Sequence, residues 1–560
     1  MATISTACLD WRERIVAGKS LIPPPLYVDE AQSALDVFNE LKIVDAPGSP
    51  TMFEACKPWV FDLVLSVFGA YNAETGRRDI TEWLLLISKK NSKSTIAAAI
   101  MLTALIRNWR ESGEFLILAP TVEIAQNSFI PARDMIRTSP ELSQMFLVQE
   151  HYRTITHRGT NATLKVVAAD SDTVGGKKAI GVLIDELWLF GKRPNAENML
   201  REACGGLASR PEGFTIFLST MSDEAPTGVF RQKLQYARGV RDGRIDDSKL
   251  VPIIYEFPEA MIEAGEHRLP ENFYITNPNL GASVDAPFLE RELRKAEEAG
   301  EESMRGFLSK HLNVEIGLSL MSDRWAGADH WEACGQPRIT LEQLIERSDV
   351  IDAGIDGGGL DDLLGLAIAG RDPDSGKWLI WVKAWAHPSV MERRKSEASR
   401  FSDFARDGDL VLVKRIGDDM DELADILAQV NDSGKLDKIG VDPHGLGDIL
   451  DTLDSIGIKQ REMGADGKEY DKIVGISQGW KLTGAIKTLE RRLAEGRIEH
   501  SGQPLMAWCV GNAKVEPRGN AITITKQAAG FAKIDPLMAT FNAISLMALN
   551  PDSGGKSFWE

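Results

Sequence analysis

The stretch that most constrains the fold of this chain runs from residue 82 to residue 99 and reads EWLLLISKKNSKSTIAAA. Its apolar residues 83–87 predict a buried strand, which a polar loop joins to a helix of small residues. This layout, with Lys93-Ser94 at the junction, is typical of a P-loop, where backbone N–H groups and a helix N-terminus meet phosphate oxygens. Lys93 would then reach the outer phosphates of a nucleotide, and the Ser94 hydroxyl would bind Mg²⁺.

The loop departs from the usual P-loop pattern because both of the expected glycines are replaced. Ile87 stands where the first glycine is usual, and Ser92 stands directly before the lysine, where the second is usual. Ser92 is therefore expected to take a positive or otherwise strained φ, which glycine adopts at no steric cost. On this stretch alone, a surface helix that follows a lysine-rich turn is the alternative interpretation.

Composition limits the class of protein. A chain of 560 residues is too long for one core, so two or three domains are expected. The net charge of −18 argues against general coating of DNA, and any nucleic-acid contact must come from a local basic face. The five cysteines have no paired spacing, which argues against a zinc site or disulfides and suits a reducing cytosol. We find no signal peptide at the start and no apolar run long enough to span a bilayer.

Further strands of the N-terminal half end in polar residues. Segments 115–118, 164–168 and 180–184 are predicted strands, and the last ends at Asp185-Glu186. Downstream of a P-loop, the first acid of such a pair holds the Mg²⁺ shell and the second can activate the attacking water. An acidic pair that caps a surface strand is the alternative. Strand 214–218 ends at Ser219-Thr220, and the alternation of strands and helices predicts a mainly parallel, three-layer α/β sheet with the site at the strands' carboxyl ends.

The C-terminal half contains a second set of acids at strand ends. After residue 225 the pattern is helical and irregular, with a turn at 277–281, a charged helix at 289–302 and a linker at 327–337. Strands are then predicted at 350–355, 364–369, 378–385 and 438–441. Asp356 and Asp442 directly follow two of them, and the last long helix begins at Asp535-Pro536. Such carboxylates, if they converge, are what a two-metal phosphodiesterase requires.

Several candidates also have simpler interpretations. Asp535 followed by proline is an ordinary helix N-cap, in which case Asp448 is the next candidate for a third acid. Other candidates are interpreted as structural: the turn acids Asp361 and Asp362, the histidines His444 and His500, and the core aromatics Trp59 and Phe61. Metal ligation by the turn acids and contact of the aromatics with an adenine ring are the alternatives.

In this order along the chain, the motifs resemble the large subunit of the terminases of tailed bacteriophages, most closely those of the HK97-like group. The similarity spans roughly residues 45–550, and these terminases often lack the first loop glycine, although Ser92 stands where they commonly have glycine. The segments that carry the resemblance are SKKNSKST at 88–95, Asp185-Glu186, Ser219-Thr220, NPNLG at 277–281, GIDGG at 354–358, Val441-Asp442-Pro443 and KIDPLMA at 533–539.

The resemblance implies a P-loop ATPase domain followed by an RNase H-like nuclease domain. Lys93 and Ser94 match the phosphate lysine and the Mg²⁺ hydroxyl, and Ser219-Thr220 match the coupling motif. Asp185 matches the metal acid and Glu186 the catalytic glutamate. The ATP-binding residues would be Ser88, Lys89, Lys90, Asn91, Ser92, Lys93, Ser94, Thr95 and Asp185, with Lys89 in the place of a basic residue that contacts the γ-phosphate. The three nuclease acids, which would hold two divalent metals (Mg²⁺ or Mn²⁺), would be Asp356, Asp442 and Asp535.

The implied enzyme drives double-stranded DNA through a portal into a procapsid and cuts concatemeric DNA. Its expected partners are a small terminase subunit, the portal and a transient ring of its own copies, in the host cytoplasm and away from membranes. The expected organisation is an N-terminal arm and helix (1–50), the ATPase domain (51–260), a helical connector (261–345) and the nuclease domain (346–560). The candidates for a trans-acting arginine are Arg133, Arg137 and Arg210.

Two other classes of protein remain as alternatives. One is a helicase-nuclease of another DNA-processing system, although residues 340–560 offer separated acids in place of a second RecA-like lobe. The other is a structural capsid or portal-adaptor protein with a decayed ATPase core, against which the presence of Lys93, Asp185 and Glu186 counts.

Overall fold

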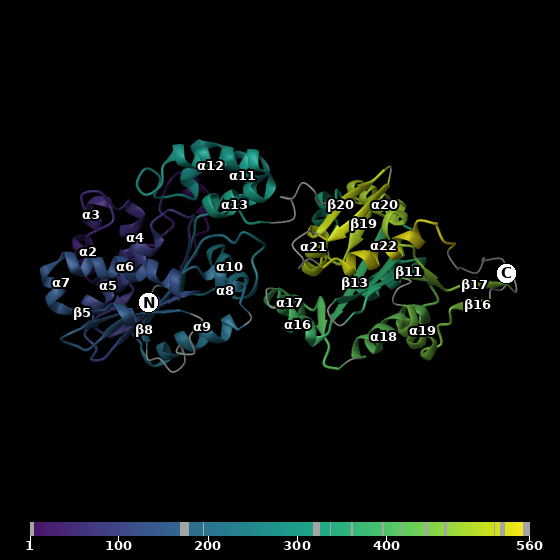
Figure 1. The fold of residues 1–560 in the computed structure, drawn as a ribbon, viewed down its shortest axis with the longest axis horizontal. Helices are drawn as coiled ribbons and strands as arrows, with labels where there is room; N and C mark the ends of the chain where they lie inside the picture. Colours follow the sequence, from purple (N-terminus) through teal and green to yellow (C-terminus); the bar gives the residue numbers. More distant parts are fainter. Residues whose placement is uncertain are drawn as a thin grey trace. The chain divides into compact units, whose positions relative to one another are not determined.

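The chain forms two compact units, Met1–Gly317 and Leu318–Glu560, each with its own central sheet (Figure 1). The computed structural model describes residues 5–168, 179–193, 195–316, 325–335, 338–359, 362–394, 397–415, 417–442, 446–463, 468–519, 521–526 and 533–552.

The sheet of the first unit is mainly parallel. Its strands lie in the order β10-β3-β9-β8-β4-β7-β6-β5. All neighbours from β10 to β7 are parallel, and β6 and β5 add an antiparallel edge. The strands are β3 (Glu82–Leu86), β4 (Glu114–Ala119), β5 (Phe146–Gln149), β6 (Thr154–His157), β7 (Thr163–Ala168), β8 (Ala179–Ile184), β9 (Phe214–Ser219) and β10 (Leu250–Ile254). The strands predicted before the loop, before Asp185 and before Ser219 are therefore confirmed.

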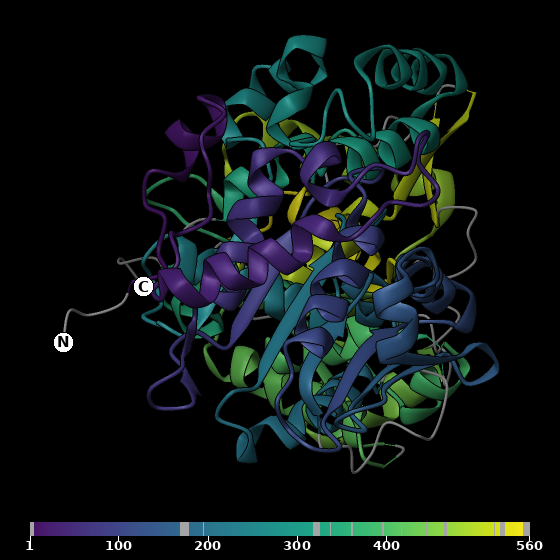
Figure 2. The same cartoon turned by 90° about the vertical axis from the view of Figure 1, so that its left-hand side faces the viewer.

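Helices cover both faces of this sheet, which makes three layers (Figures 1 and 2). Successive strand residues point to opposite faces, and β8 is buried at every position, as a parallel strand between two helical layers must be. One layer contains α2 (Val28–Glu40), α4 (Pro58–Phe68), α5 (Lys93–Ile106) and α6 (Val122–Thr138). The other contains α8 (Leu187–Gly191), α9 (Ala196–Gly205) and α10 (Gly228–Arg241). Shorter elements of this unit include α1 (Trp11–Val16), α3 (Met52–Ala55), α7 (Pro140–Met145) and the hairpin of β1 (Tyr71–Asn72) and β2 (Arg77–Arg78).

Residues 259–316 continue the first unit as helices. The single charged helix predicted at 289–302 is instead two, α12 (Ala286–Ala299) and α13 (Glu301–Leu312), which follow the short α11 (Glu259–Glu263). The break falls at Gly300, whose φ of 94° is outside the helical range and is a conformation that glycine readily adopts. Leu289 and Leu293 of α12 are buried, whereas the charged residues of the helix lie on its outer side.

The second unit has a mixed sheet in the order β14-β13-β12-β11-β15-β18, and β19 also pairs with β13. The long strands β11, β12 and β13 are antiparallel neighbours, whereas β15 is parallel to β11. The strands are β11 (Val350–Gly357), β12 (Leu363–Arg371), β13 (Trp378–Ala386), β14 (Leu410–Leu412), β15 (Leu436–Val441), β18 (Ile473–Gly475) and β19 (Ile498–His500). The helices include α15 (Leu341–Arg347), α17 (Ala398–Arg406), α18 (Asp418–Asp432), α19 (Leu446–Ser455), α20 (Thr483–Ala494), α21 (Pro504–Gly511) and α22 (Asp535–Met547). This arrangement agrees with the mixed α/β fold expected of an RNase H-like domain.

Helix α22 lies directly on the sheet because three strand residues beneath it lack side chains. A Cβ at Gly354 of β11 would lie 2.1 Å from the Ala539 carbonyl oxygen, and one at Gly365 of β12 would lie 2.8 Å from the Pro536 Cα. Gly440 of β15 faces the same helix at Asn542. The Asn542 side chain donates a 2.9 Å hydrogen bond to the Ile355 carbonyl, which fixes the helix along β11. The start of α22 is thereby placed beside the ends of β11 and β12.

The interpretation of residues 327–337 as a linker is wrong for the part that the structure describes. Residues 328–331 form helix α14 (Ala328–Trp331), and a 3₁₀ turn (Glu332–Gly335) follows it. Trp325 and Trp331 are fully buried in the core of the second unit, so burial of large aromatic surface fixes this segment. Within the described residues, no helix combines the length and the apolar character that a membrane crossing requires.

Candidate active sites

The phosphate loop has the strained backbone that its sequence suggests. Ser92 has φ 58° and ψ 25°, and Lys90 has φ 70°, so two residues with side chains occupy the left-handed region within three positions. Each such residue costs about 1–2 kcal/mol relative to a right-handed conformation. Helix α5 begins at Lys93, directly after Ser92, whose side chain makes no capping bond. The strand–loop–helix layout is confirmed, and the alternative of a surface helix after a turn is excluded because α5 is buried along most of its length.

The predicted phosphate lysine and the predicted Mg²⁺ residues lie together at the carboxyl ends of β3 and β8. The Lys93 ammonium lies 3.4 Å from the carbonyl oxygens of both Ile87 and Ser88. The Ser94 hydroxyl donates to Asp185 at 3.3 Å, and the Ser128 hydroxyl donates to the same carboxylate oxygen at 3.2 Å. Burial lowers the pKa of Lys93, against the charges of Glu186 and Asp185, which raise it. Burial and the Glu186 charge together raise the pKa of Asp185 to about 6.

These residues suit a bound Mg²⁺ and the phosphates of a nucleotide. Mg²⁺ prefers oxygen ligands, and a hydroxyl and a carboxylate already lie side by side at the start of a helix. A cation beside Asp185 would favour the ionised form of its buried carboxyl group.

Glu186 is held by a tryptophan that the sequence analysis did not single out. Glu186 has φ 52°, and its carboxylate accepts a 2.6 Å hydrogen bond from the indole N–H of Trp188. The Trp188 ring in turn lies 3.1 Å from the ammonium of Lys310, which comes from α13. Lys310 also donates to the Met221 carbonyl at 2.9 Å. Burial lowers the pKa of Lys310 to about 7, although the nearby Asp223 carboxylate raises it.

The predicted coupling residues lie between the phosphate loop and α8. Ser219 is the register partner of Leu86, and its carbonyl accepts a 3.0 Å hydrogen bond from Ile87 N–H. The Ser219 hydroxyl accepts from Trp188 N–H at 3.1 Å and donates to the Thr220 carbonyl at 2.8 Å. A displacement of the end of β9 would therefore also displace the start of the phosphate loop and α8, the helix that follows Glu186.

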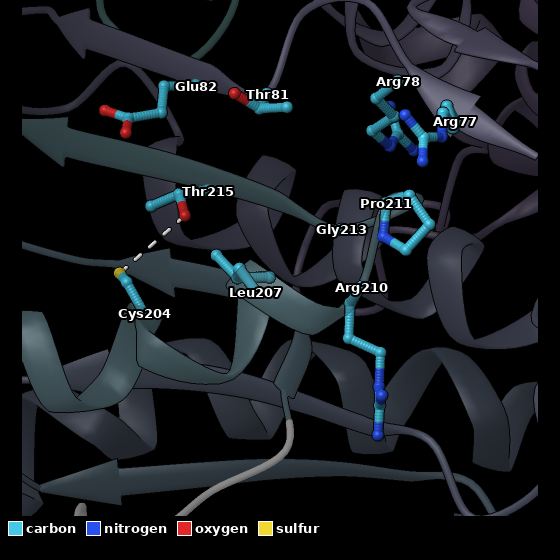
Figure 3. A pocket seen from close by; sticks show the side chains of 10 residues that line it. All are labelled: Arg77, Arg78, Thr81, Glu82, Cys204, Leu207, Arg210, Pro211, Gly213 and Thr215. Atoms are coloured by element: carbon cyan, nitrogen blue, oxygen red, sulfur yellow. Dashed lines mark hydrogen bonds between the residues drawn. The ribbon is translucent and has the colours of Figure 1, made fainter.

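The three candidate arginines differ in their surroundings. Arg133 and Arg137 both form ion pairs with Glu150. Arg210 lines a cavity of about 350 Å³, together with Arg77 and Arg78 (Figure 3). This cavity is bounded by residues at the amino ends of β3 and β9 and therefore lies at the opposite edge of the sheet from Lys93.

In the second unit, the strand ends bring the three predicted nuclease acids to one edge of the sheet. Asp356 and Asp442 directly follow Ile355 and Val441, which are register partners on parallel strands. Asp356 pairs in register with Gly365, over which the start of α22 packs. The Asp535 Cβ lies 3.3 Å from where a Cβ of Gly357 would be. Among the residues that the structure describes, however, no three His, Cys, Asp or Glu side chains are arranged to hold one metal ion together. The metal site therefore stays a prediction based on these positions.

The interpretation of Asp535 as an N-cap is wrong. The N-cap position is Ile534, Asp535 is the first helical residue, and no side-chain capping bond is made.

Asp362 forms an ion pair with the buried Lys533, so the turn acid is tied to the segment that precedes α22. His500 is buried and stacked on Trp331, and its ring nitrogens contact Trp331 O and Gly502 N–H, which agrees with a structural role. Asp361 and His444, and the side chain of Asp448, lie outside the described residues.

Of the two aromatics predicted to lie in the core, Trp59 is buried, whereas Phe61 is only half-buried and its ring lies 6.4 Å from that of the exposed Phe53. Trp59 is 6% exposed and donates its indole N–H to Asn279 at 2.9 Å. The contact with Asn279, a residue 220 positions away in the sequence, was not predicted.

Fold and site together define a nucleotide-hydrolysing P-loop domain followed by a nuclease domain with acids at its strand ends. Residues 58–239 match the family model for the ATPase domain of the terminase large subunit, and residues 254–550 match that for its endonuclease domain. The chain therefore belongs to the terminase large subunits, and it is an ATPase and endonuclease of bacteriophage DNA packaging.

Several known proteins are similar to this chain. The large terminase subunit of Enterobacteria phage HK97 is 23% identical over 475 residues, which cover 84% of this chain and 86% of that protein. The crystal structure of the HK97 large terminase is 20% identical and has a TM-score of 0.47, with 92% of this chain and 99% of that chain covered. The large terminase nuclease of the thermophilic phage G20c is 13% identical and has a TM-score of 0.25, with 40% of this chain and 98% of that chain covered.

Proposed function

We propose that this chain hydrolyses ATP at Lys93, Ser94, Asp185 and Glu186 to move double-stranded DNA into a procapsid, and that it cuts the DNA at Asp356, Asp442 and Asp535. The observation that carries the motor half is the approach of Ser94 and Asp185 to within 3.3 Å beside the buried Lys93. Ser94 lies in the first turn of α5 and Asp185 directly follows β8, and the two residues are 91 positions apart in the sequence. In this proposal residues 51–260 form the ATPase domain, 261–345 the connector and 346–560 the nuclease domain; the connector residues up to 316 continue the first unit, and residues 325–335 pack in the core of the second.

Each residue of the ATP site has a distinct role in the proposed reaction. Lys93 and the N–H groups at the start of α5 bind the outer phosphates, and the other loop residues, Ser88 to Ser92 and Thr95, surround them. Ser94 and Asp185 hold Mg²⁺, which when bound neutralises charge on the phosphates. Glu186 orients the attacking water and accepts its proton. Its hydrogen bond to Trp188 supports this role because it fixes the carboxylate in one orientation.

The proposed nuclease uses the acids at the edge of the second sheet. Asp356 and Asp442 project from neighbouring strand ends, and Asp535 reaches the same edge from α22. Carboxylates in this position would hold two divalent cations, Mg²⁺ or Mn²⁺, which stabilise the attacking and leaving oxygens of a phosphodiester.

The partners follow from the same proposal. Packaging requires double-stranded DNA, a small terminase subunit that delivers it, and a portal on the procapsid on which copies of this chain assemble as a ring. Because the chain carries a net charge of −18, DNA must be gripped through local basic surfaces and can be released readily. The proposed location is the host cytoplasm during packaging.

Glu186→Gln tests the ATPase assignment. The variant should bind ATP, measured by calorimetry, with an affinity close to that of the wild type, because glutamine keeps the size of the side chain. It should release phosphate at least about 100-fold more slowly, because a general base contributes about 10²–10⁴-fold. Glu202→Gln, a change at an exposed position of α9, is the matched control and should hydrolyse ATP normally. Turnover by Glu186→Gln at the wild-type rate would show that the general base is elsewhere.

A further inference from the structure

The phosphate loop is held from outside by residues 276–283, a segment that we call the clasp. The clasp lies about 190 positions after the loop in the sequence, between the 3₁₀ turn Pro270–Ile275 and α12. It contains Asn277 and Asn279, and the side chain of Asn91 projects into it from the loop. Asn91 and Asn277 are fully buried and Asn279 is 5% exposed, so their amide groups depend on one another for hydrogen bonds.

Asn91 bonds to the clasp and to its own loop. Its side-chain NH₂ group donates to the Asn277 side-chain oxygen at 3.0 Å and to the Ser88 carbonyl at 3.1 Å. Its side-chain oxygen accepts from Asn279 N–H at 3.0 Å. The Asn91 side chain therefore bonds both to the start of its own loop, at Ser88, and to the clasp.

The clasp also binds the backbone of the loop. The Asn279 side chain donates to the Asn91 carbonyl at 3.2 Å, and the Ser283 hydroxyl donates to the Lys90 carbonyl at 2.6 Å. Asn279 is itself fixed by Trp59, and Asn277 donates to the His311 carbonyl of α13 at 2.9 Å. The two anchored carbonyls therefore belong to the residues just before Ser92.

Anchoring these carbonyls orients the N–H groups of the loop. In a trans peptide, the C=O of one residue and the N–H of the next point in opposite directions. The Lys90 and Asn91 carbonyls point toward the clasp, so the N–H groups of Asn91 and Ser92 point away from it. Donors of this kind on successive residues form an anion-binding concavity.

We propose that Asn277 and Asn279 are positioning residues of the phosphate loop, which hold Lys90 and Ser92 in the left-handed conformation and aim the Asn91 and Ser92 N–H groups at nucleotide phosphates. In other P-loops, glycine permits this conformation; here a buried amide network imposes it on residues with side chains. The inference rests on the proposed ATP site and adds that nucleotide affinity depends on the connector. Because the clasp also bonds to α13, loop geometry and connector position are linked.

The test measures ADP affinity of the full chain by calorimetry in the presence of Mg²⁺. Asn279→Ala removes the donor to the Asn91 carbonyl and should raise the Kd for ADP about tenfold, whereas Ser283→Ala, a change at an exposed residue, should raise it about threefold. Asn272→Ala is the matched control, because Asn272 lies in the same region and its side chain, among the described contacts, bonds only to the Glu266 carbonyl. Its Kd should equal that of the wild type.

A rescue experiment separates loop positioning from general packing. Adding Ser92→Gly to Asn279→Ala should recover most of the lost affinity, because glycine adopts the left-handed conformation without the clasp. Wild-type affinity in a folded Asn279→Ala variant, or a loss that Ser92→Gly does not recover, would overturn the inference. If Asn279→Ala does not fold, the same comparison is made with Ser283→Ala. Wild-type ADP affinity in Ser283→Ala, or a loss of affinity that adding Ser92→Gly does not recover, would then overturn the inference.

A further variant distinguishes failure of the clasp from failure of the ATP site. Lys93→Ala should abolish ADP binding whether or not the clasp positions the loop. If Lys93→Ala binds ADP normally, the proposed ATP site is wrong, and the inference falls with it. If Lys93→Ala loses binding while both clasp variants keep it, the inference alone is wrong.

Discussion

Replacing Lys310 by methionine should stabilise the first unit at neutral pH while it slows ATP hydrolysis. Lys310 is 8% exposed, and burial lowers its pKa from 10.5 to about 7, although Asp223 and Glu186 raise it. At low pH, where Lys310 is protonated in both the folded and the unfolded chain, a pKa shift of this size destabilises the folded chain by about 5 kcal/mol. Methionine also loses two favourable contacts of Lys310. The lost hydrogen bond to the Met221 carbonyl costs about 1 kcal/mol, and the lost contact with the Trp188 ring costs about 2 kcal/mol. The methionine variant should therefore be more stable by about 1–2 kcal/mol near pH 6.5.

The pH dependence has a definite sign. The pKa of Lys310 is lower in the folded chain than in the unfolded chain, so the unfolded chain binds the proton more strongly. The destabilisation by Lys310 is complete below about pH 7, shrinks as pH rises from 7 toward 10.5, and is absent above that range. The advantage of the methionine variant should thus fall to zero or reverse by about pH 9.

Calorimetric unfolding of the full chain at pH 6.5 and pH 9 measures this difference. The transition that shifts on addition of ADP belongs to the first unit, because ligand binding stabilises only the unit that binds. Lys295→Met, at an exposed position of α12 that pairs with Glu292, is the matched control and should show little change at either pH. The value of kcat should fall about tenfold in Lys310→Met. The Trp188 ring, which hydrogen-bonds to Glu186, loses its contact with the Lys310 ammonium and therefore holds Glu186 less firmly. A stability difference that is the same at both pH values would refute the reasoning.

Three further substitutions test separate parts of the two sites. Ser92→Gly should keep activity and tighten ADP binding up to about fivefold, since glycine relieves the strained φ of 58°; complete loss of activity would instead indicate a specific contact of the Ser92 hydroxyl. Trp188→Phe removes the indole N–H that donates to Glu186, so kcat should drop about tenfold with KM unchanged, and a rise in KM alone would argue against this role. Asp535→Asn should abolish metal-dependent cleavage of plasmid DNA, because asparagine keeps the size of the side chain and removes the charge that would hold a divalent cation; normal cutting would exclude it as the third acid.

The sequence predicted those parts of the molecule that depend on local patterns. The apolar runs before Ser88, Asp185 and Ser219 are strands because their residues are buried on both faces, and the P-loop layout identified the edge where they meet. The positive φ of Ser92 was also expected, because the usual glycine is absent there. Asp442 directly follows β15 as predicted, whereas β11 continues two residues past its predicted end, so that Asp356 is its penultimate residue.

Contacts between distant segments could not be predicted. The turn that contains Asn277 was recognised, but nothing in its sequence indicates that it binds Asn91, 186 positions earlier. Lys310 lies in a region of many charged residues, so its burial beside Trp188 is visible only in the folded chain. The linker predicted at 327–337 is helical in part, because the Trp331 ring is buried in the core of the second unit against residues that are distant in the sequence.

The central claim, that one chain carries two separate active sites, is tested most directly by assaying ATP hydrolysis and plasmid cleavage in the same preparations. Lys93→Ala should lose phosphate release and keep metal-dependent cleavage in the absence of ATP, because Lys93 and the nuclease acids belong to different units. Asp356→Asn should do the opposite, with wild-type ATP hydrolysis and no cleavage. Hydrolysis of ATP by Lys93→Ala, or cutting of plasmid DNA by Asp356→Asn, would contradict the account.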